Sequence, residues 1–331
     1  MKFTLIICTY KRPQPLLKLL KSVRGQTLYP DYILIIDGSP DDRTQDVLQE
    51  HPFKGLSYYK VPPEYRGLTK QRNYGIARVT MDQDIVCFLD DDTILEKDYF
   101  KNLLSGFCEL PNAVGIGGIA INQNRWKKNV NDFASNNNIY TLDNYYIEES
   151  LRNKVRNFLK LQSPLPPSQM PDFSHVRTYS YPLNGKRYPV DLIVGMSMAF
   201  RAHIFKKIMF SSYFEGYGLY EDADFCLRAQ SFGELHIDTN VQLYHYHDPD
   251  GRPNQFKYGK MVIRNGWYVW RIRYPKPTIK ARFKWNTTAA ILTIIRLTNA
   301  LSGKGRMAAL TESLGRIVGW WSLLFNKPKR V

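Results

Sequence analysis

The sequence predicts an α/β protein built on a doubly wound mixed sheet, with a helical appendage at its C-terminus. Through the first ~110 residues, apolar runs of strand length alternate with segments of helical periodicity, as they do in sheets covered by helices on both faces. From residue 291 onward, apolar residues recur at intervals of three and four, which predicts amphipathic helices. A hydrophobic content of 44% in 331 residues is enough for a globular core.

The first elements follow the expected periods. Residues 3–8 are continuously apolar, which predicts a strand buried on both faces. After a loop at residues 9–13, leucines recur at helical spacing up to Val23, and Gly25 ends the helix. Residues 32–36 predict a second buried strand.

The alternation continues beyond the second strand. Asp41 can cap a helix that runs to Glu50, and residues 56–60 predict a short strand. The next helix carries Arg72 and Asn73 near its start. These elements complete the pattern of a doubly wound domain.

The following strand runs directly into three carboxylates. Residues 86–89 are apolar, and Asp90, Asp91 and Asp92 come next. In an open α/β sheet, ligands bind at the carboxyl ends of the strands. Three adjacent acids repel one another, and a divalent cation such as Mg²⁺ or Mn²⁺ relieves that repulsion. The alternative is an Asp-rich turn that caps the next helix.

The same edge of the sheet collects further polar residues. This layout places Thr9 and Tyr10, Asp37, and Arg72 with Asn73 beside the acidic triplet. A nucleotide fits there, since a loop aromatic can stack on a base and a carboxylate can accept from a base or ribose. The chain lacks a Gly-x-Gly-x-x-Gly after its first strand and a Walker A loop, which argues against a dehydrogenase or a P-loop enzyme. Taken individually, a residue such as Asp37 or Arg72 is more often part of a turn or a salt bridge than of a binding site.

The middle of the chain is less regular. Residues 122–189 are rich in Asn, Ser, Pro and Tyr, and predict an insertion that borders the active site, with a helix around residues 151–159. We expect one catalytic domain at residues 1–250 that contains this insertion. Residues 251–331 are expected to form a C-terminal helical, amphipathic region.

Two later segments carry candidate chemistry. Glu221 and Asp222 open a helix, where the dipole stabilises acidic side chains. A first-turn carboxylate such as Asp222 can also accept a proton from a hydroxyl nucleophile, whereas Asp224 is expected to be structural. His245 and His247 lie at the end of a further strand, where either can be a metal ligand or an ordinary surface histidine.

Taken in order, these segments resemble the family 2 glycosyltransferases, which are inverting enzymes with the GT-A fold. The resemblance covers roughly residues 1–275, and its motifs are specific as an ordered set. They are Ile7-Cys8-Thr9-Tyr10-Lys11-Arg12-Pro13, Ile36-Asp37-Gly38-Ser39, Gly67 with Arg72-Asn73-x-Gly75-Ile76, Phe88-Leu89-Asp90-Asp91-Asp92, Gly195-x-x-Met198-Ala199-x-Arg201, Glu221-Asp222-x-Asp224, Arg228 with Gly233, His245, and Arg264-Asn265. The chain departs from the family after its second strand, where it has one residue fewer than the usual Asp-Asp-Gly-Ser.

The resemblance implies a role for each matching residue. Asp222 would be the general base, Asp92 a direct metal ligand and His245 a metal-proximal histidine, with His247 as the alternative. Gly195, Met196 and Glu221 would lie near the acceptor or sugar. Asp91, as the variable middle position of the acidic motif, would contribute least. The remaining residues would bind the nucleotide sugar: Thr9, Tyr10, Arg12, Asp37, Arg72, Asn73, Asp90 and Asp91.

The implied reaction is metal-dependent, inverting transfer from a nucleoside-diphosphate sugar to a hydroxyl of a glycan or lipid-linked acceptor, as in polysaccharide synthesis, with Mn²⁺ or Mg²⁺ as cofactor. A net charge of +16 favours anionic partners. Near the C-terminus, an apolar helix stripe is followed by Lys327, Lys329 and Arg330, and together with Trp320 this favours an anionic membrane surface. The stripe consists of Met307, Leu310, Leu314, Ile317, Trp321 and Leu324. The alternative is that this stripe packs on the catalytic domain or on a second subunit.

Two other classes of protein remain open: a nucleotidyltransferase-like enzyme, and a non-catalytic sugar- or lipid-binding member of the fold. Scattered basic residues argue against nucleic acid as a partner. An oligomer is compatible with the sequence. Four widely spaced cysteines predict core thiols in a reducing compartment, and the N-terminus shows no signal peptide. We therefore expect a cytoplasmic protein that is peripheral on the inner face of the membrane.

Overall fold

The computed structural model describes residues 1–214, 216–247, 254–301 and 305–329. The chain forms two compact units, of which the first comprises Met1–Asn124 and Leu183–Arg252. The second comprises Arg125–Pro182 and Pro253–Val331. The middle segment and the C-terminal helices therefore belong to one unit. The expected boundary at residue 250 lies outside the described residues, and a catalytic role for residues 1–250 stays a prediction.

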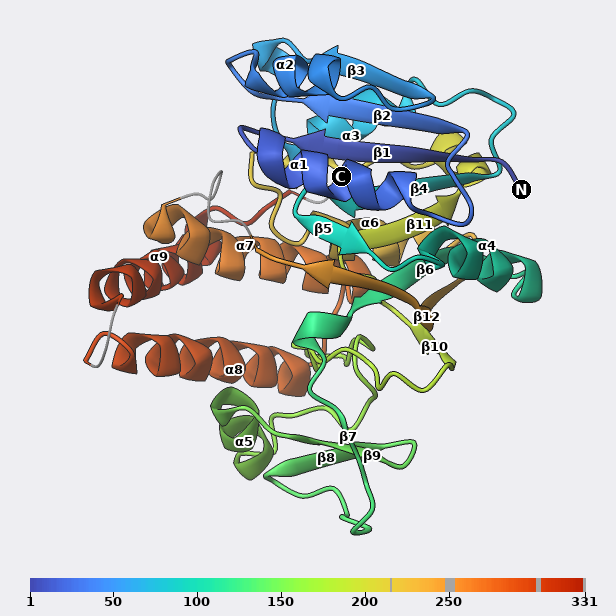
Figure 1. Cartoon of the computed structure of the whole chain (residues 1–331). Coiled ribbons are helices and arrows are strands. Elements are labelled where there is room, and N and C mark those ends of the chain that lie inside the picture. The colour runs from blue at the N-terminus through green and yellow to red at the C-terminus, as the bar shows by residue number, and fades with distance from the viewer. Residues whose placement is uncertain (215, 248–253, 302–304, 330–331) are drawn as a thin grey trace. The chain divides into compact units, whose positions relative to one another are not determined.

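The first unit is built on one large sheet (Figure 1). Its elements, in chain order, are β1 (Phe3–Thr9), α1 (Pro13–Arg24), β2 (Tyr32–Asp37), α2 (Arg43–Glu50), β3 (Leu56–Lys60), η1 (Pro63–Tyr65), α3 (Leu68–Ile76), β4 (Ile85–Asp90), β5 (Thr93–Leu95), α4 (Tyr99–Glu109), β6 (Ala113–Ala120), η2 (Ile121–Gln123), β10 (Arg187–Val190), β11 (Ser197–Arg201), η3 (Ala202–Lys206), η4 (Ser212–Phe214), α6 (Glu221–Ala229) and β12 (Glu234–His245).

The sheet mixes parallel and antiparallel pairs. Its strand order is β10-β12-β6-β11-β4-β1-β2-β3, with β5 paired to β12. β1 is parallel to both β2 and β4, whereas β11 is antiparallel to β4 and to β6. The mixed sheet that the sequence predicts is therefore confirmed.

Helices cover both faces of this sheet, which explains why its strands read as continuous apolar runs. Leu5, Ile7 and Leu89 share a core with residues of α1, α2 and α4. The opposite face packs against α3, where the absent side chain of Gly75 leaves room for Ile6 and Ile36. In Figure 1, α1 lies in front of the sheet and α3 behind it.

Strand register brings polar residues together at one edge. Thr9 is paired with Asp37, and Cys8 with Asp90. Because β1, β2 and β4 are parallel, their carboxyl ends meet at that edge, which is where α/β sheets bind ligands. The sequence-predicted site residues on these three strands therefore lie side by side.

The second unit combines a small sheet, in the order β7-β9-β8, with helices. The helix expected around residues 151–159 is present as α5 (Leu151–Phe158). None of the described helices is both long and apolar enough to cross a bilayer. The elements are β7 (Lys127–Lys128), β8 (Ile139–Leu142), β9 (Tyr145–Glu148), α5, α7 (Gln255–Arg273), α8 (Ile279–Thr298) and α9 (Arg306–Phe325).

The cysteines are all unpaired, but they are not all core thiols. Cys87 and Cys226 are buried in the first unit, whereas Cys108 is exposed. The expectation of four core thiols is wrong at Cys108. Other residues of α4 form the buried face of the helix, and Cys108 is not one of them. No disulfide links the described residues.

Candidate active site

Two acids of the triplet and one histidine form a group that can hold a metal ion. One ligand atom from each of Asp90, Asp92 and His245 lies within 4.8 Å of the others. His245 Nε2 is 3.1 Å from Asp92 Oδ1 and 4.0 Å from Asp90 Oδ2. Carboxylate oxygens suit divalent cations such as Mn²⁺ and Mg²⁺, and an imidazole can complete the set, so these residues fit a divalent metal ion.

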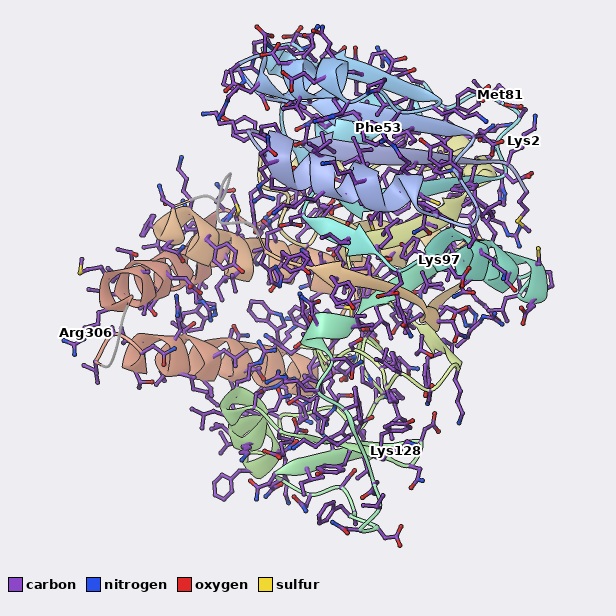
Figure 2. All side chains as sticks on the ribbon, viewed as in Figure 1. Lys2, Phe53, Met81, Lys97, Lys128 and Arg306 are labelled. Atoms are coloured by element: carbon purple, nitrogen blue, oxygen red, sulfur yellow. The ribbon has the colours of Figure 1, made fainter. Side chains whose placement is uncertain are left out.

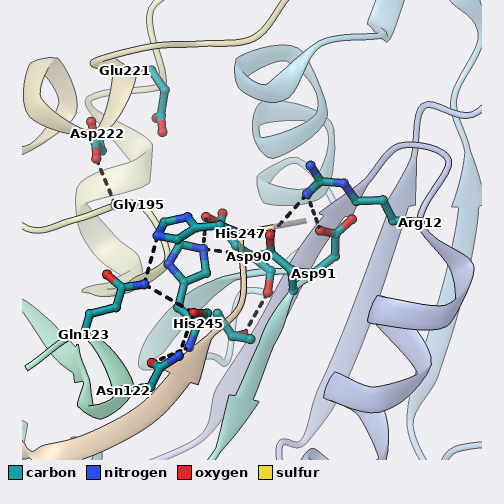
Figure 3. A network of polar contacts seen from close by, with 12 residues as sticks. Arg12, Asp90, Asp91, Asn122, Gln123, Gly195, Glu221, Asp222, His245 and His247 are labelled. Atoms are coloured by element: carbon teal, nitrogen blue, oxygen red, sulfur yellow. Dashed lines mark hydrogen bonds and ion pairs between the residues drawn. The ribbon is translucent and has the colours of Figure 1, made fainter. Parts of the chain in front are cut away.

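Amide side chains of η2 hold the two histidines (Figure 3). Asn122 donates from Nδ2 to the carbonyl of His245 at 2.9 Å, and it accepts from the His245 N–H at 3.1 Å. The amide nitrogen of Gln123 lies 2.9 Å from Nε2 of His247. The histidine rings are 4.1 Å apart, but only His245 belongs to the metal-capable group among the described residues.

The middle carboxylate, Asp91, is held by the loop after β1. Thr9 Oγ1 donates to Asp91 Oδ2 at 2.7 Å, and Arg12 lies 3.1 Å from Asp91 Oδ1 and 3.5 Å from Asp92 Oδ2. Burial raises the pKa of Asp91 to about 7, against the opposing effect of Arg12. Thr9 and Arg12, which were expected at the nucleotide sugar, thus contact the acidic triplet.

Arg72 connects the acidic triplet to the start of α6. Its guanidinium forms an ion pair with Glu221 and lies 3.7 Å from Asp90 Oδ1. It also donates to the carbonyl of Gly195 at 3.3 Å, and it lies over the rings of Phe88 and Phe210. Burial raises the pKa of Glu221 to about 8, while Arg72 opposes that rise. A buried ion pair therefore ties α3 to α6.

Asp222 is oriented by backbone N–H groups. Its Oδ2 accepts from the Gly195 N–H at 2.9 Å, and its Oδ1 accepts from the Ala223 N–H at 2.8 Å. The first turn of α6 adds the positive end of the helix dipole. Because Gly195 also contacts Arg72, a chain of contacts joins Asp222 to Asp90. The acids at 90–92 and at 222, far apart in sequence, are thus linked within the first unit through Arg72 and Gly195.

The residues expected to hold the nucleoside differ in their accessibility. Asp37 is fully buried, and its carboxylate accepts from the Ser39 N–H at 2.7 Å and from the Tyr58 hydroxyl at 2.9 Å. Tyr10, in contrast, is 40% exposed in the loop after β1, so its ring is available for stacking.

Two other expected residues have structural contacts. The Asn73 amide donates to the Phe210 carbonyl and accepts from the Phe210 N–H, both at 2.9 Å. Met196 is buried, and its carbonyl accepts from the Asp90 N–H at 3.4 Å. Both residues connect the edge of the sheet to the segments that flank β11.

Sequence reasoning missed two amides at this edge. Gln71 donates to the carbonyls of Thr9 and Ile36, at 3.1 and 2.7 Å, and it accepts from the Gly67 N–H at 3.2 Å. Gln71 thereby joins the ends of β1 and β2. Asn122 is the other. Neither residue carries a signal in the sequence, because an isolated amide acquires its partners only when the strands pair.

Comparison with known proteins points to one family. The model of glycosyl transferase family 2 matches residues 4–180. The chain is 33% identical over 110 residues to the O-antigen chain rhamnosyltransferase RfbN of Salmonella typhimurium, and 29% identical over 126 residues to a glucosyl-dolichyl phosphate glucuronosyltransferase of Haloferax volcanii. These matches cover 33% and 37% of the chain, and 34% and 39% of the two relatives.

Solved structures share the fold. A mannosyltransferase from Pyrobaculum calidifontis, determined with GDP-mannose and Mn²⁺, aligns with a TM-score of 0.54 at 14% identity, over 99% of this chain and 88% of that one. GalNAc-T7, determined with UDP, GalNAc and Mn²⁺, aligns with a TM-score of 0.52 at 13% identity, over 86% and 54%. The architecture is that of the GT-A glycosyltransferases.

Proposed function

The chain belongs to glycosyl transferase family 2, and we propose that it transfers a sugar from a nucleoside-diphosphate sugar to a hydroxyl of a glycan or lipid-linked acceptor. The observation that carries this proposal is the chain of contacts from Asp90 through Arg72 and Gly195 to Asp222. It brings a metal-capable group and a candidate base to one edge of the sheet.

The proposed cofactor is Mn²⁺ or Mg²⁺, held by Asp92 and His245 with Asp90 beside them. When bound, the ion would offset the negative charge that develops on the departing diphosphate. The Pyrobaculum and GalNAc-T7 structures contain Mn²⁺, which supports this choice. Arg72 and Arg12 add fixed positive charge around the same carboxylates.

Asp222 is the proposed general base. As the acceptor oxygen attacks the anomeric carbon, the carboxylate of Asp222 takes up the hydroxyl proton, and the bond to the diphosphate breaks on the opposite face of the sugar. A single displacement of this kind inverts the anomeric configuration. The N–H groups of Gly195 and Ala223 hold the carboxylate in place, and a positioned base typically contributes ~100- to 10,000-fold.

The remaining site residues have supporting roles in this proposal. Tyr10 would stack on the base of the nucleotide, since its ring is exposed. Asp37 would act through Tyr58 and Ser39, which its carboxylate holds. Glu221 would position Arg72 beside the diphosphate.

We also propose that the protein works in the cytoplasm at the inner face of a membrane, on a growing or lipid-linked polysaccharide. The relation to an O-antigen chain rhamnosyltransferase and to an enzyme that acts on a dolichyl phosphate supports this class of acceptor. Both of those matches cover well under half of the relatives' length.

A thermal-shift screen of nucleotide sugars with Mn²⁺, followed by an assay for nucleoside diphosphate, tests the proposal. A bound donor raises the melting temperature, because the ligand binds the native state. Release of nucleoside diphosphate that depends on donor and Mn²⁺ supports sugar transfer. Pyrophosphate release from a nucleoside triphosphate would indicate a nucleotidyltransferase, and a shift without turnover under any acceptor would indicate a binding protein.

A further inference from the structure

The outer face of α9 is apolar and exposed. Its large side chains include Trp321, 56% exposed, and Phe325, 89% exposed. Contiguous apolar surface of this kind marks an interaction site in a folded protein. We call this set of residues the α9 outer face: Met307, Leu314, Ile317, Val318, Trp321, Leu324 and Phe325.

The inner face of the same helix consists mostly of small residues, with Ala309, Ser313, Gly315 and Gly319 buried beside Glu312 and Leu323. α9 packs against α7 through Gly315 and Gly319, and α7 contributes Gly259. A Cβ atom at Gly259 would lie 2.1 Å from the Glu312 carbonyl oxygen, and one at Gly315 would lie 2.1 Å from the Phe256 carbonyl oxygen. An ordinary surface helix buries its large apolar side chains, whereas α9 buries mostly small residues and exposes large apolar ones. Small residues at the contact and apolar residues outside are typical of helices in lipid.

The surrounding charge is almost entirely positive. Residues 253–331 contain sixteen lysines and arginines and one acidic residue, Glu312. Glu312 is buried, and it pairs with Arg296 at 2.7 Å and with Arg316 at 2.6 Å. The only acid of the segment is thus neutralised inside. Exposed basic residues stand at both ends of α9, with Arg306 as its first residue (Figure 2) and Lys327 and Lys329 after its end; Arg330 lies outside the described residues.

We infer that the α9 outer face is a membrane-docking surface, which inserts into the headgroup region of an anionic bilayer while the flanking basic residues contact lipid phosphates. Apolar insertion and electrostatic attraction act together in interfacial helices. A second copy of the chain would satisfy the apolar residues equally well, but it would bring two strongly positive segments together. An anionic surface instead matches this charge. The inference rests on the proposed membrane location, and it names the residues responsible.

Vesicle sedimentation tests the surface without donor or acceptor. The full chain is mixed with phosphatidylcholine vesicles, with and without phosphatidylglycerol, at low and physiological salt. The wild type should sediment with the anionic vesicles, and added salt should weaken this binding. Leu314→Gln combined with Trp321→Gln should weaken it at least about 10-fold. Lys327→Ser combined with Lys329→Ser should remove most of the preference for phosphatidylglycerol.

Met81→Gln is the matched control, because Met81 is a highly exposed apolar residue of the first unit. It should bind vesicles like the wild type, and all variants should keep the wild-type melting temperature. Equal vesicle binding by the wild type and the Leu314/Trp321 variant would overturn the inference. A second outcome would also overturn it: sedimentation velocity shows that the wild type is a dimer and the Leu314/Trp321 variant a monomer, and neither protein binds vesicles.

The same preparations separate this inference from the proposed function. The residues proposed to bind the donor and Mn²⁺ lie outside α9, and thermal shift measures donor binding separately from vesicle binding. Loss of vesicle binding with donor binding retained would contradict only the docking surface. Vesicle binding by a protein that binds no nucleotide sugar would contradict only the proposed function.

Discussion

The side-chain amide of Asn122 makes two hydrogen bonds with the backbone of His245, a residue 123 positions later in the chain. This contact fixes the end of β12, and with it the imidazole that lies 3.1 Å from Asp92. Asn122 does not touch the proposed metal position itself. It is a positioning residue for the histidine.

Replacing Asn122 should therefore weaken metal binding. Asn122→Ala removes both hydrogen bonds, and we expect the Mn²⁺ dissociation constant to rise about 10-fold, as for other residues that orient a metal ligand. Mn²⁺ titration monitored by electron paramagnetic resonance measures this directly. Asn122→Asp, which keeps the acceptor for the His245 N–H, should recover part of the affinity. Unchanged affinity in both variants would show that β12 holds His245 without Asn122.

The two histidines should differ in their effect on the metal. His245→Ala removes one of the three proposed metal-binding side chains, which lies close to Asp92. The Mn²⁺ concentration needed for half-maximal donor binding should therefore rise by at least about 10-fold. His247→Ala removes a ring that faces Gln123, and the requirement should change much less. Thermal shifts with donor at a series of Mn²⁺ concentrations compare the two. A larger effect at His247 would reverse the assignment.

Asp222→Asn should abolish transfer while the donor still binds. The amide keeps the size of the carboxylate but cannot accept the acceptor proton, so we expect turnover to fall ~100- to 10,000-fold. Nucleoside diphosphate release gives the rate, and thermal shift gives donor binding. Asp46→Asn, at an exposed position of α2, is the matched control. Turnover near that of the wild type in Asp222→Asn would exclude Asp222 as the base.

Packing of α7 on α9 should be sensitive to one methyl group. Gly259→Ala places a Cβ atom 2.1 Å from the Glu312 carbonyl oxygen, so the helices must move apart. We expect the free energy of unfolding to fall by about 1–3 kcal/mol, as for other overpacked sites. Urea denaturation measures the change. Gly25→Ala is the control, because its nearest non-neighbouring atom would be 3.6 Å away. Similar stability of the two variants would contradict the close approach.

His175 should make the second unit less stable in mild acid. Burial, with help from Arg156, lowers the pKa of His175 to about 3, below the ~6.5 expected in the unfolded chain. Between these values the unfolded state binds the extra proton, so stability is lost as the pH falls from about 6.5 towards 3.

His175→Asn tests this effect, because asparagine tolerates the positive φ of 58° at this position. Relative to this variant, the wild type should lose about 1–2 kcal/mol more of its unfolding free energy between pH 7 and pH 5. Urea denaturation at both pH values gives the comparison. Parallel losses in the two proteins would mean that His175 is accessible to solvent protons when folded.

The local elements could be predicted well from the sequence. The strand at residues 56–60 has the predicted limits, and Asp222 opens a helix as expected. The apolar run that ends in Asp90 is the central strand β4. Periodicity of apolar residues reports the shape of each element, because the helix and the strand repeat at different intervals.

The partners of the site residues could not be predicted in the same way. Arg12 holds Asp91, and Asn122 holds His245, yet neither pair is close in sequence. Such contacts depend on strand register and on side-chain direction, which the local pattern does not contain. The assignment of Asp91 as the least important acid also left out its burial and its contact with Thr9, and its role remains a prediction.

The sequence by itself determined the order of strands and helices, the acidic end of β4 and the apolar stripe of α9. Only the tertiary structure decided that His245 rather than His247 joins the acids, and that the stripe of α9 faces outward. The physical reason is the same in both cases. A period places residues on one face of an element, but the packing of distant segments decides whether that face lies inside; here the glycines of α7 and α9 brought the opposite face of the helix into the core.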